Sequence, residues 1–344
     1  MSLHSEIHEQ PAVIQNLLGK QTEITRIAAE IRKIDPAYVF LAARGTSDNA
    51  GRYANYLWGA YNRLPVALAT PSLFTFYQQS PLLKGALVTT VSQSGKSPDI
   101  VAVVEEGKRQ GCASLAITNA PDSPLAAVSD FVIDIAAGPE KAVAATKTYT
   151  AELLAMALLS VELADDSTRR AELQNLPIWA QQVLALDEEI ARLAERFRYM
   201  EHCVVIGRGF NYATAFEWSL KMKELTYSVA EPYSSADFQH GPIAMVERGF
   251  PVFAVAPSGV ILPDMLGLLK NLRETHHAEL TVISDNLEAL ALAQSPIQLP
   301  AGIPEWLSPI IAIIPAQLFC YHLTRTRGFD TEAPRTIHKV TETH

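Results

Sequence analysis

Residues 87–99 place a run of hydroxyl side chains between an apolar segment and the start of a helix. They read Leu-Val-Thr-Thr-Val-Ser-Gln-Ser-Gly-Lys-Ser-Pro-Asp. Ser97 is a favourable N-cap residue and Pro98 a favourable first helical residue. The first amides of a helix have no partner inside it, so Ser92, Ser94 and Ser97 would crowd around a natural site for a phosphate monoester. The sequence therefore predicts a phosphate-binding turn, with an ordinary capped loop as the alternative.

Three charged residues further along the chain could perform acid–base chemistry. If residues 217–227 form a helix, Glu217, Lys221 and Glu224 share one face, because they are spaced at i, i+4 and i+7. A carboxylate in this position could act as a base whose protonation is tuned by the neighbouring ammonium group. The alternative is a solvated helix that carries an ordinary Glu–Lys pair.

Two further residues are candidates for proton transfer and carbonyl binding. His240 is followed by Gly-Pro, which fixes it in a turn after a polar loop over residues 231–243, where it could shuttle a proton or be a structural surface residue. Asp237 and Glu231 are either loop caps or polar partners of the site. Lys339 lies in a short polar tail of the kind that usually frays. It is either an idle exposed lysine or a group that binds an open-chain sugar carbonyl or its phosphate.

Short apolar strands alternate with helix-length segments in the first half of the chain. A helical segment over about residues 5–34 comes first, with Pro11 at a boundary. Strands separated by helices argue for a parallel sheet with helices on both faces. The predicted strands are 38–43, 66–69, 87–91, 114–118 and 131–135, and the predicted helices run to Trp58, over 98–110 and over 144–164.

The second half of the chain repeats the first. Arg208 follows an apolar strand as Arg44 does, at an offset of 208 − 44 = 164, and Ser258 matches Ser94 at 258 − 94 = 164. We therefore predict two copies of one doubly wound α/β unit. Alanines such as Ala254 replace the hydroxyl cluster in the second copy, so the first copy should hold the phosphate. The predicted segments are an N-terminal helical segment (1–35), a first domain (36–165), a helical connector (166–195), a second domain (196–328) and a tail over the site (329–344).

Composition argues against several classes of function. The 344 residues are 48% hydrophobic and 19% charged, which is typical of a well-packed soluble protein, and a net charge of −9 argues against a nucleic-acid partner. Cys112, Cys203 and Cys320 lie far apart, so we expect buried thiols, no metal site and a reducing compartment. The polar N-terminus does not resemble a secretory signal, and Pro315 is expected to cut short the apolar run 310–314. These features predict a cytoplasmic protein with no membrane span and no cofactor.

Taken together, these stretches resemble the sugar isomerase (SIS) domain family, present as a tandem pair over about residues 10–343. They resemble in particular the isomerase half of glutamine–fructose-6-phosphate aminotransferase, which makes glucosamine 6-phosphate. The resemblance implies two doubly wound, flavodoxin-like parallel-sheet domains. The stretches that carry it are Arg44-Gly-Thr-Ser47, Ser92-Gln-Ser-Gly95, Val143-Ala-Ala-Thr-Lys147, Gly207-Arg-Gly209, Leu220-Lys-Met-Lys-Glu224, His240-Gly-Pro242 and the tail with Pro334, Arg335 and Lys339.

Finer features look closer to the stand-alone SIS-type glucosamine-6-phosphate deaminases. They are Ala43-Arg-Gly-Thr-Ser-Asp-Asn49, Ser97-Pro98-Asp99, Ala137-Gly-Pro-Glu140 and the ending Lys-Val-Thr-Glu-Thr343. This resemblance implies that glucosamine 6-phosphate loses ammonia and gives fructose 6-phosphate, through ring opening, proton transfer between C1 and C2, and loss of the amine. It also implies a homodimer with a shared active site.

The resemblance implies a role for each matching residue. Glu224 would move the proton between C1 and C2, flanked by Glu217 and Lys221. His240 would assist ring opening, and Lys339 would sit over the open-chain carbonyl. The 6-phosphate would be held by Thr46, Ser47, Ser92, Gln93, Ser94 and Ser97, and the substrate would be lined by Arg44, Gly45, Val143 and Ala144.

Departures from the synthase pattern keep other functions open. The chain starts Met-Ser and lacks a glutaminase domain with an N-terminal cysteine, so we expect no glutamine hydrolysis. Asp237 and Gln239 differ from the residues usual beside the family's histidine. The alternatives are the synthetic direction with ammonia or a separate glutaminase, plain phosphosugar isomerisation or deglycation, and a non-catalytic sugar-phosphate sensor. Sensors of this type usually carry a basic DNA-binding domain, which the sequence before residue 35 does not suggest.

Overall fold

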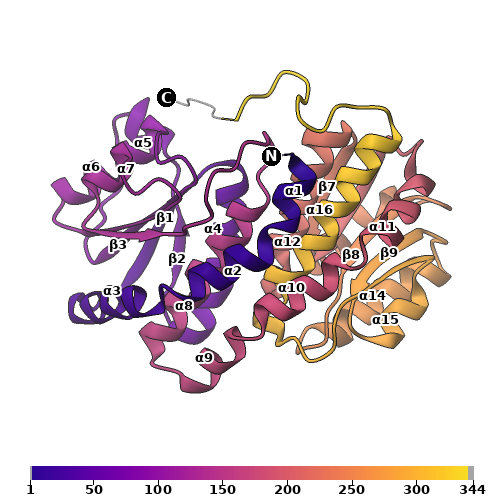
Figure 1. Cartoon of the computed structure of the whole chain (residues 1–344), viewed down its shortest axis with the longest axis horizontal. Coiled ribbons are helices and arrows are strands. Elements are labelled where there is room, and N and C mark those ends of the chain that lie inside the picture. Colours follow the sequence, from indigo (N-terminus) through magenta and orange to yellow (C-terminus); the bar gives the residue numbers. More distant parts are fainter. Residues whose placement is uncertain (1, 340–344) are drawn as a thin grey trace. The chain divides into compact units, whose positions relative to one another are not determined.

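Two five-stranded parallel sheets form the core of the computed structural model, which describes residues 2–339 (Figure 1). The chain divides into two compact units, each assembled from separate pieces of sequence. In the described chain, the first-sheet unit comprises residues 12–141, 147–175 and 338–339. The second-sheet unit comprises residues 2–11, 142–146 and 176–337. The first residues of the chain therefore belong with the second sheet, although the first sheet follows them in sequence.

The first sheet has the strand order β2-β1-β3-β4-β5, with all neighbouring strands parallel. Its strands are β1 (Tyr38–Ala42), β2 (Val66–Leu68), β3 (Ala86–Ser92), β4 (Ala113–Thr118) and β5 (Phe131–Asp134). The helices around it are α2 (Gln10–Leu18), α3 (Gln21–Ile34), α4 (Gly45–Asn62), α5 (Ser72–Thr75), α6 (Pro98–Arg109), α7 (Pro124–Val128), α8 (Lys147–Ala164) and α9 (Ser167–Leu173).

Helices cover both faces of the first sheet, which is why its central strands are buried and mostly apolar. Every residue of β3 is buried. Helices α6 and α7 pack on the face that carries Phe40 and Val88. Helix α4 packs on the opposite face, where its Gly51 lies against Leu41, and α8 in turn packs against α4 and α3.

The second sheet has the order β10-β9-β8-β6-β7. Its strands are β6 (His202–Gly207), β7 (Val229–Ser234), β8 (Pro251–Val255), β9 (Glu279–Ser284) and β10 (Ser295–Gln298). The helices of this unit are α1 (Leu3–His8), α10 (Leu176–Leu184), α11 (Asp187–Ala194), α12 (Tyr212–Lys221), α13 (Ser235–Gln239), α14 (Leu262–Glu274), α15 (Leu287–Leu292) and α16 (Ser308–Thr326). Short helical turns are η1 (Glu195–Phe197), η2 (Gly209–Asn211), η3 (Met222–Thr226), η4 (Pro242–Met245) and η5 (Glu305–Leu307).

The two sheets share one topology. If the strands of each copy are counted from its own start, both sheets have the order 2-1-3-4-5, which is the flavodoxin-like doubly wound order. Helices α14 and α15 pack on one face of the second sheet, and α12 and α16 pack on the other. There Trp218, Phe253 and Phe319 form an aromatic cluster with ring centroids 5.0, 5.2 and 6.0 Å apart. The predicted tandem α/β fold is confirmed.

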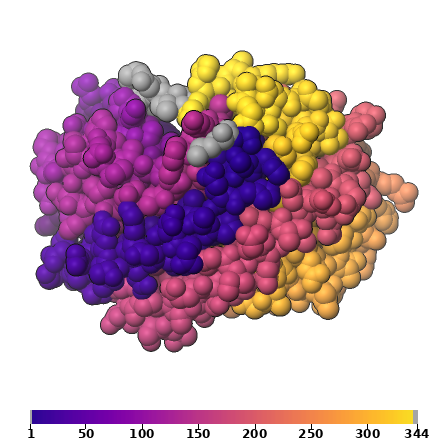
Figure 2. Space-filling model, viewed as in Figure 1, coloured from indigo at the N-terminus to yellow at the C-terminus, as the bar shows by residue number. Residues whose placement is uncertain are grey.

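The N-terminal helix α1 packs against α16 within the second-sheet unit. The backbone N–H of Leu3 donates to the carboxylate of Glu332 at 3.1 Å, and Nε2 of Gln10 donates to Oε1 of Gln317 at 2.9 Å. Figure 2 shows these first residues, in indigo, at the surface beside the yellow C-terminal segment. The helical segment predicted over about 5–34, with a boundary at Pro11, consists of three helices, with breaks at Glu9, close to that boundary, and at Gly19 and Lys20, where no break was predicted.

Two local predictions from proline and polarity were wrong. Residues 229–234 are an edge strand and not part of a polar loop, because β7 pairs with β6 on one side only, where Pro232 and polar side chains are tolerated. Pro315 lies inside α16 and does not end the helix. Its ring removes one backbone hydrogen bond, but the surrounding turns are buried and held by core packing.

Helix α16 lies within the most apolar long helical segment of the described residues. In the part of the chain that the structure describes, one segment, Glu305–Thr326, is long and apolar enough to cross a membrane. Of its apolar 18-residue stretch, 94% is buried inside the protein. Core helices of soluble proteins have the same length and composition, so this segment is weak support for a membrane span.

The C-terminal tail does not fray where the structure describes it. The backbone N–H of Arg335 donates to the Tyr227 hydroxyl at 2.9 Å. The Arg335 guanidinium lies 4.5 Å from the Tyr227 ring centroid and 5.0 Å from that of Phe329. These contacts fasten the tail to the residue that follows η3. The predicted ending Lys-Val-Thr-Glu-Thr343 lies outside the described residues after Lys339.

Candidate active site

The predicted phosphate turn lies at the carboxyl edge of the first sheet, where the strand order reverses. Strands β1 and β3 are parallel neighbours, and the chain leaves them toward α4 and α6 respectively. In doubly wound sheets this crevice is the usual ligand site. Ser97 is the N-cap of α6 and Pro98 is its first residue, as predicted, although the Ser97 hydroxyl makes no capping hydrogen bond in the described chain.

An ion pair joins the two loops at this edge. Nε and Nη2 of Arg44 donate to Oδ2 of Asp99 at 2.8 and 2.7 Å, and the Asp99 side chain is fully buried. Half of the Arg44 side chain remains exposed, which leaves positive charge at this edge of an acidic protein. The second sheet repeats the pair as Arg208 and Asp264, 2.7 Å apart, at offsets of 208 − 44 = 164 and 264 − 99 = 165.

The serine hydroxyls of the turn accept hydrogen bonds from its own backbone. The N–H of Gly95 donates to Oγ of Ser92 at 3.2 Å, and that of Lys96 donates to Oγ of Ser94 at 3.4 Å. Since the oxygens act as acceptors, the two hydroxyl protons stay available to an anion. Only glycine fits at position 95, because φ is +60° and a Cβ would lie 2.0 Å from Oγ of Ser123.

The other predicted phosphate ligands have more varied surroundings. Thr46 is half-buried in the first turn of α4, behind Gly45, the first residue of that helix. Ser47 is buried, and its hydroxyl donates to Oε1 of Glu152 on α8 at 2.8 Å. The hydroxyl proton that Ser47 would offer to a phosphate is therefore already used in this hydrogen bond. Gln93 is half-buried, and its carbonyl accepts the N–H of Asn119 at 3.3 Å.

The equivalent turn of the second sheet is occupied by carboxylates of the chain itself. Glu305 accepts the N–H groups of Val260 at 2.8 Å and Ile261 at 3.3 Å, just before α14. Asp285 accepts the N–H of Ser258 at 2.6 Å. A Cβ at Gly259 would lie 2.3 Å from Cδ of Glu305, so the Glu305 carboxylate packs directly against the backbone of this turn. This supports the first copy as the one that binds phosphate.

Lys339 is paired and not idle. Its Nζ lies 2.6 Å from Oε2 of Glu140, whose side chain is fully buried, and both belong to the first-sheet unit. Glu140 also accepts the N–H of Thr148 at 3.2 Å and its hydroxyl at 2.8 Å. A buried carboxylate at the start of α8 thus anchors the tail lysine. The sequence signalled Glu140 only as part of the family resemblance.

Two predicted lining residues belong to the other unit. Val143 is half-buried and Ala144 is buried, and both lie in the segment 142–146 of the second-sheet unit. Nε2 of Gln317 on α16 donates to the Thr146 carbonyl at 3.3 Å, which holds this segment in place. That Val143 and Ala144 line the substrate stays a prediction.

The three charged residues at 217–224 meet, as their spacing predicts. Nζ of Lys221 lies 3.3 Å from Oε1 of Glu217 and 2.5 Å from Oε2 of Glu224. Lys221 and Glu217 are buried, with 1% and 0% of their side chains exposed, whereas 24% of the Glu224 side chain is exposed. Glu224 is therefore the carboxylate of this group that a substrate can reach.

The electrostatics of the group favour charged side chains. Burial lowers the pKa of Lys221, but the carboxylates of Glu217 and Glu224 outweigh burial and raise that pKa above its usual range. Lys221 therefore remains an ammonium group at neutral pH. It is unsuited to act as a base itself.

Glu224 lies on a widened helical turn and not on the α-helix that the pattern predicts. Helix α12 ends at Lys221, and η3 continues as a π-helical turn that ends at Thr226 and is followed by Tyr227, where φ is +57°. The guanidinium of Arg327 fixes this turn, because Nη1 donates to the Thr226 carbonyl at 2.7 Å and Nη2 donates to the Met200 carbonyl. Such π-turns are frequent at functional sites.

His240 follows α13 in a turn, as predicted. It is exposed, and its N–H donates to the Asp237 carbonyl at 3.1 Å. No hydrogen bond or ion pair joins His240 to Glu224 within residues 2–339. Asp237 is part of a helix cap, since Oγ of Ser234 donates to its Oδ2 at 2.7 Å and accepts its N–H at 3.1 Å. Glu231 lies exposed on β7.

A family model described as the SIS domain matches the chain twice, over residues 34–161 and 197–327. The glutamine–fructose-6-phosphate aminotransferase [isomerizing] of Thermococcus kodakarensis is 33% identical over 97% of this chain and 56% of its own length. The chain thus spans little more than half the length of the curated relatives that it matches.

Two solved structures match over nearly their whole length. The C-terminal domain of glucosamine–fructose-6-phosphate aminotransferase from Francisella tularensis is 29% identical, with a TM-score of 0.86 over 96% of this chain and 98% of its own. A chain from Silicibacter pomeroyi, provisionally described as a phosphosugar isomerase, is 34% identical, with a TM-score of 0.86 over 96% of this chain and 100% of its own.

The expected closeness to the deaminases gains no support from these comparisons. The glucosamine-6-phosphate deaminase from Thermotoga maritima is 20% identical, with a TM-score of 0.75 over 97% of this chain and 100% of its own. A likeness at that identity shows the fold alone. Two matches to the SIS model cover most of the chain, and a solved chain of the same extent is 34% identical, so the protein belongs to the SIS domain family.

Proposed function

We propose that the protein is a phosphosugar isomerase that converts glucosamine 6-phosphate and water to fructose 6-phosphate and ammonia. The observation that carries the proposal is a partly exposed carboxylate, Glu224, held by the buried ammonium group of Lys221. Family membership supports it, because a relative of the chain is named an isomerizing aminotransferase of fructose 6-phosphate. A base beside two adjacent carbons is what aldose–ketose interconversion needs.

In this proposal, Glu224 takes the proton from C2 of the open-chain sugar and returns it to C1. The aldehyde at C1 becomes an alcohol and an imine forms at C2, which water hydrolyses to the ketone and ammonia. His240 assists ring opening, and Lys339 faces the open-chain carbonyl. The hydroxyls of the 92–97 turn bind the phosphate, whose fixed position orients the reacting carbons.

The amination direction is a second candidate. The same proton transfer run in reverse would make glucosamine 6-phosphate from fructose 6-phosphate and ammonia. The name of the Thermococcus kodakarensis relative favours this direction, whereas the likeness to the deaminase from Thermotoga maritima shows the fold alone. The homodimer and the cytoplasmic location stay predictions.

The test is to incubate the pure protein with glucosamine 6-phosphate and to assay ammonia and fructose 6-phosphate. We expect both products in equal amounts, and consumption of ammonia when fructose 6-phosphate and ammonium are supplied instead. Galactosamine 6-phosphate and fructosyl-amine phosphates are run in parallel. Binding of all these sugars without turnover of any would contradict the proposal and favour the non-catalytic sensor.

Replacing Ser94 by Ala should weaken phosphosugar binding by about 10- to 150-fold, because the loss of one hydrogen bond to a charged group costs about 1.5–3 kcal/mol. Thermal stability should change little, since Ser94 accepts only one long backbone bond in the turn. Isothermal titration with glucosamine 6-phosphate measures the effect. The matched control is Ser258→Ala, at the same place in the second copy, which should leave affinity unchanged. If both variants bind glucosamine 6-phosphate with equal affinity, the phosphate is bound somewhere other than the 92–97 turn.

A further inference from the structure

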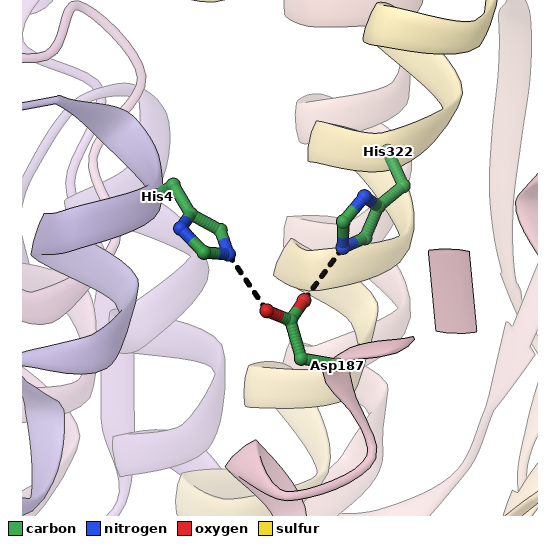
Figure 3. Close-up of side chains that lie close together, drawn as sticks. All are labelled: His4, Asp187 and His322. Carbon is green, nitrogen blue, oxygen red and sulfur yellow. Dashed lines mark hydrogen bonds and ion pairs between the residues drawn. The ribbon is translucent and has the colours of Figure 1, made fainter. Parts of the chain in front are cut away.

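Two histidines and an aspartate converge at one point of the second-sheet unit (Figure 3). Nε2 of His4 lies 2.8 Å from Oδ2 of Asp187, and Nε2 of His322 lies 2.6 Å from Oδ1 of the same carboxylate. The three ligand atoms lie within 4.8 Å of one another. They come from α1, the first turn of α11 and α16, which are separated by 183 and 135 residues in the chain. Sequence spacing therefore gave no metal signal here.

A third histidine adjoins the cluster. His8 follows His4 by four residues on α1, their ring centroids lie 4.3 Å apart, and Nε2 of His8 lies 3.6 Å from Oδ2 of Asp187. Two histidines at i and i+4 on one helix face have a chelating spacing. Nδ1 of His8 lies 3.0 Å from the His4 carbonyl, which can only accept, so Nδ1 carries a proton. In the neutral ring, Nε2 then offers its lone pair toward Asp187.

We propose that His4, His8, Asp187 and His322 bind a divalent metal ion of the zinc class. Imidazole nitrogens with one carboxylate suit Zn²⁺, Co²⁺ and Ni²⁺, whereas Mg²⁺ and Ca²⁺ prefer oxygen ligands. His4, Asp187 and His322 would supply three of the four donors of a tetrahedral zinc site, and the adjoining His8 would supply the fourth. The hydrogen bond from Nδ1 of His8 to a backbone carbonyl is the kind of outer contact that orients a metal-binding histidine.

The surroundings permit an ion to enter. The exposed fractions of the side chains are 35% for His4, 36% for His8, 23% for Asp187 and 15% for His322. Burial raises the pKa of Asp187, but its hydrogen bonds with His322 and His4 outweigh burial and lower it, so the carboxylate is ionised at neutral pH. An ion there would fasten α1 to α11 and α16.

The test is titration of the full chain with ZnCl2 and CoCl2 after treatment with a chelator. We expect one Zn²⁺ per chain, and visible absorption of tetrahedral Co²⁺. The double variant His4→Gln/His322→Gln should lose at least 100-fold in Zn²⁺ affinity, and Asp187→Asn should lose 10-fold or more.

The matched control is His202→Gln, which removes an exposed histidine from the same unit outside the cluster. It should bind Zn²⁺ as the unchanged protein does. Circular dichroism and thermal melting without metal show whether each variant folds. If the double variant does not fold, the Zn²⁺ affinity of Asp187→Asn provides the test instead. Stoichiometric Zn²⁺ binding that survives both sets of substitutions, or no saturable binding by the unchanged chain, would overturn the proposal.

Discussion

Replacing Glu224 by Gln should lower kcat by about 10²–10⁴-fold, which is the usual contribution of a positioned general base. The change keeps the shape of the side chain and removes its capacity to take a proton. Binding of glucosamine 6-phosphate should change little, because in our proposal the hydroxyls of the 92–97 turn hold the phosphate. Steady-state kinetics measures the loss of turnover, and isothermal titration measures the affinity separately.

The variant should fold normally, since Lys221 keeps Glu217 as a partner 3.3 Å away. The matched control is Glu288→Gln, which removes a carboxylate from the exposed pair with Lys270 in the same unit. That control should keep full activity. Turnover by Glu224→Gln at the rate of the unchanged protein would show that the base is another residue. Loss of binding together with turnover would show that Glu224 mainly holds the substrate.

The sequence predicted every strand of the first sheet, including its edge strands β2 and β5, but it missed both edge strands of the second sheet. In a doubly wound sheet, central strands such as β1 are covered on both faces and read as apolar runs. The edge strands β7 and β10 contain Pro232 and Pro296 and alternate with polar residues, because only one side of each is hydrogen-bonded. Neither was predicted as a strand. The offset of 164 residues was informative, because it also relates Arg44 to Arg208. In the structure, each of these arginines forms an ion pair with an aspartate at the edge of its own sheet.

Local spacing predicted that the charged residues of the 217–224 segment meet, but contacts between residues far apart in the sequence were not predicted. Glu217, Lys221 and Glu224 lie within eight residues, so their meeting follows from helical geometry even though η3 widens the last turn. Glu140 was not among the predicted site residues, because its partner Lys339 lies 199 residues away. Glu305 was missed for the same reason, since it reaches the turn before α14 from a distant loop.

Replacing Lys221 by Met should destabilise the protein by about 3–5 kcal/mol, which is the usual cost of breaking a buried ion pair by removing one partner. Lys221 is only 1% exposed, and the side chain of Glu217 beside it is fully buried. Methionine fills much of the volume but leaves the Glu217 carboxylate without its ammonium group. Urea unfolding followed by tryptophan fluorescence measures the shift of the transition midpoint.

The double variant Glu217→Gln/Lys221→Met separates charge from packing. If the cost comes from a buried carboxylate that has lost its cation, neutralising Glu217 should recover most of the lost stability. The matched control is Lys270→Met, which removes the ammonium group of an exposed pair and should shift the midpoint little. An equal loss in the single and double variants would mean that Lys221 contributes through packing, and a small loss in Lys221→Met would show that the charge is not needed. In either case, the claim that the buried ion pair of Lys221 and Glu217 stabilises this helix would fail.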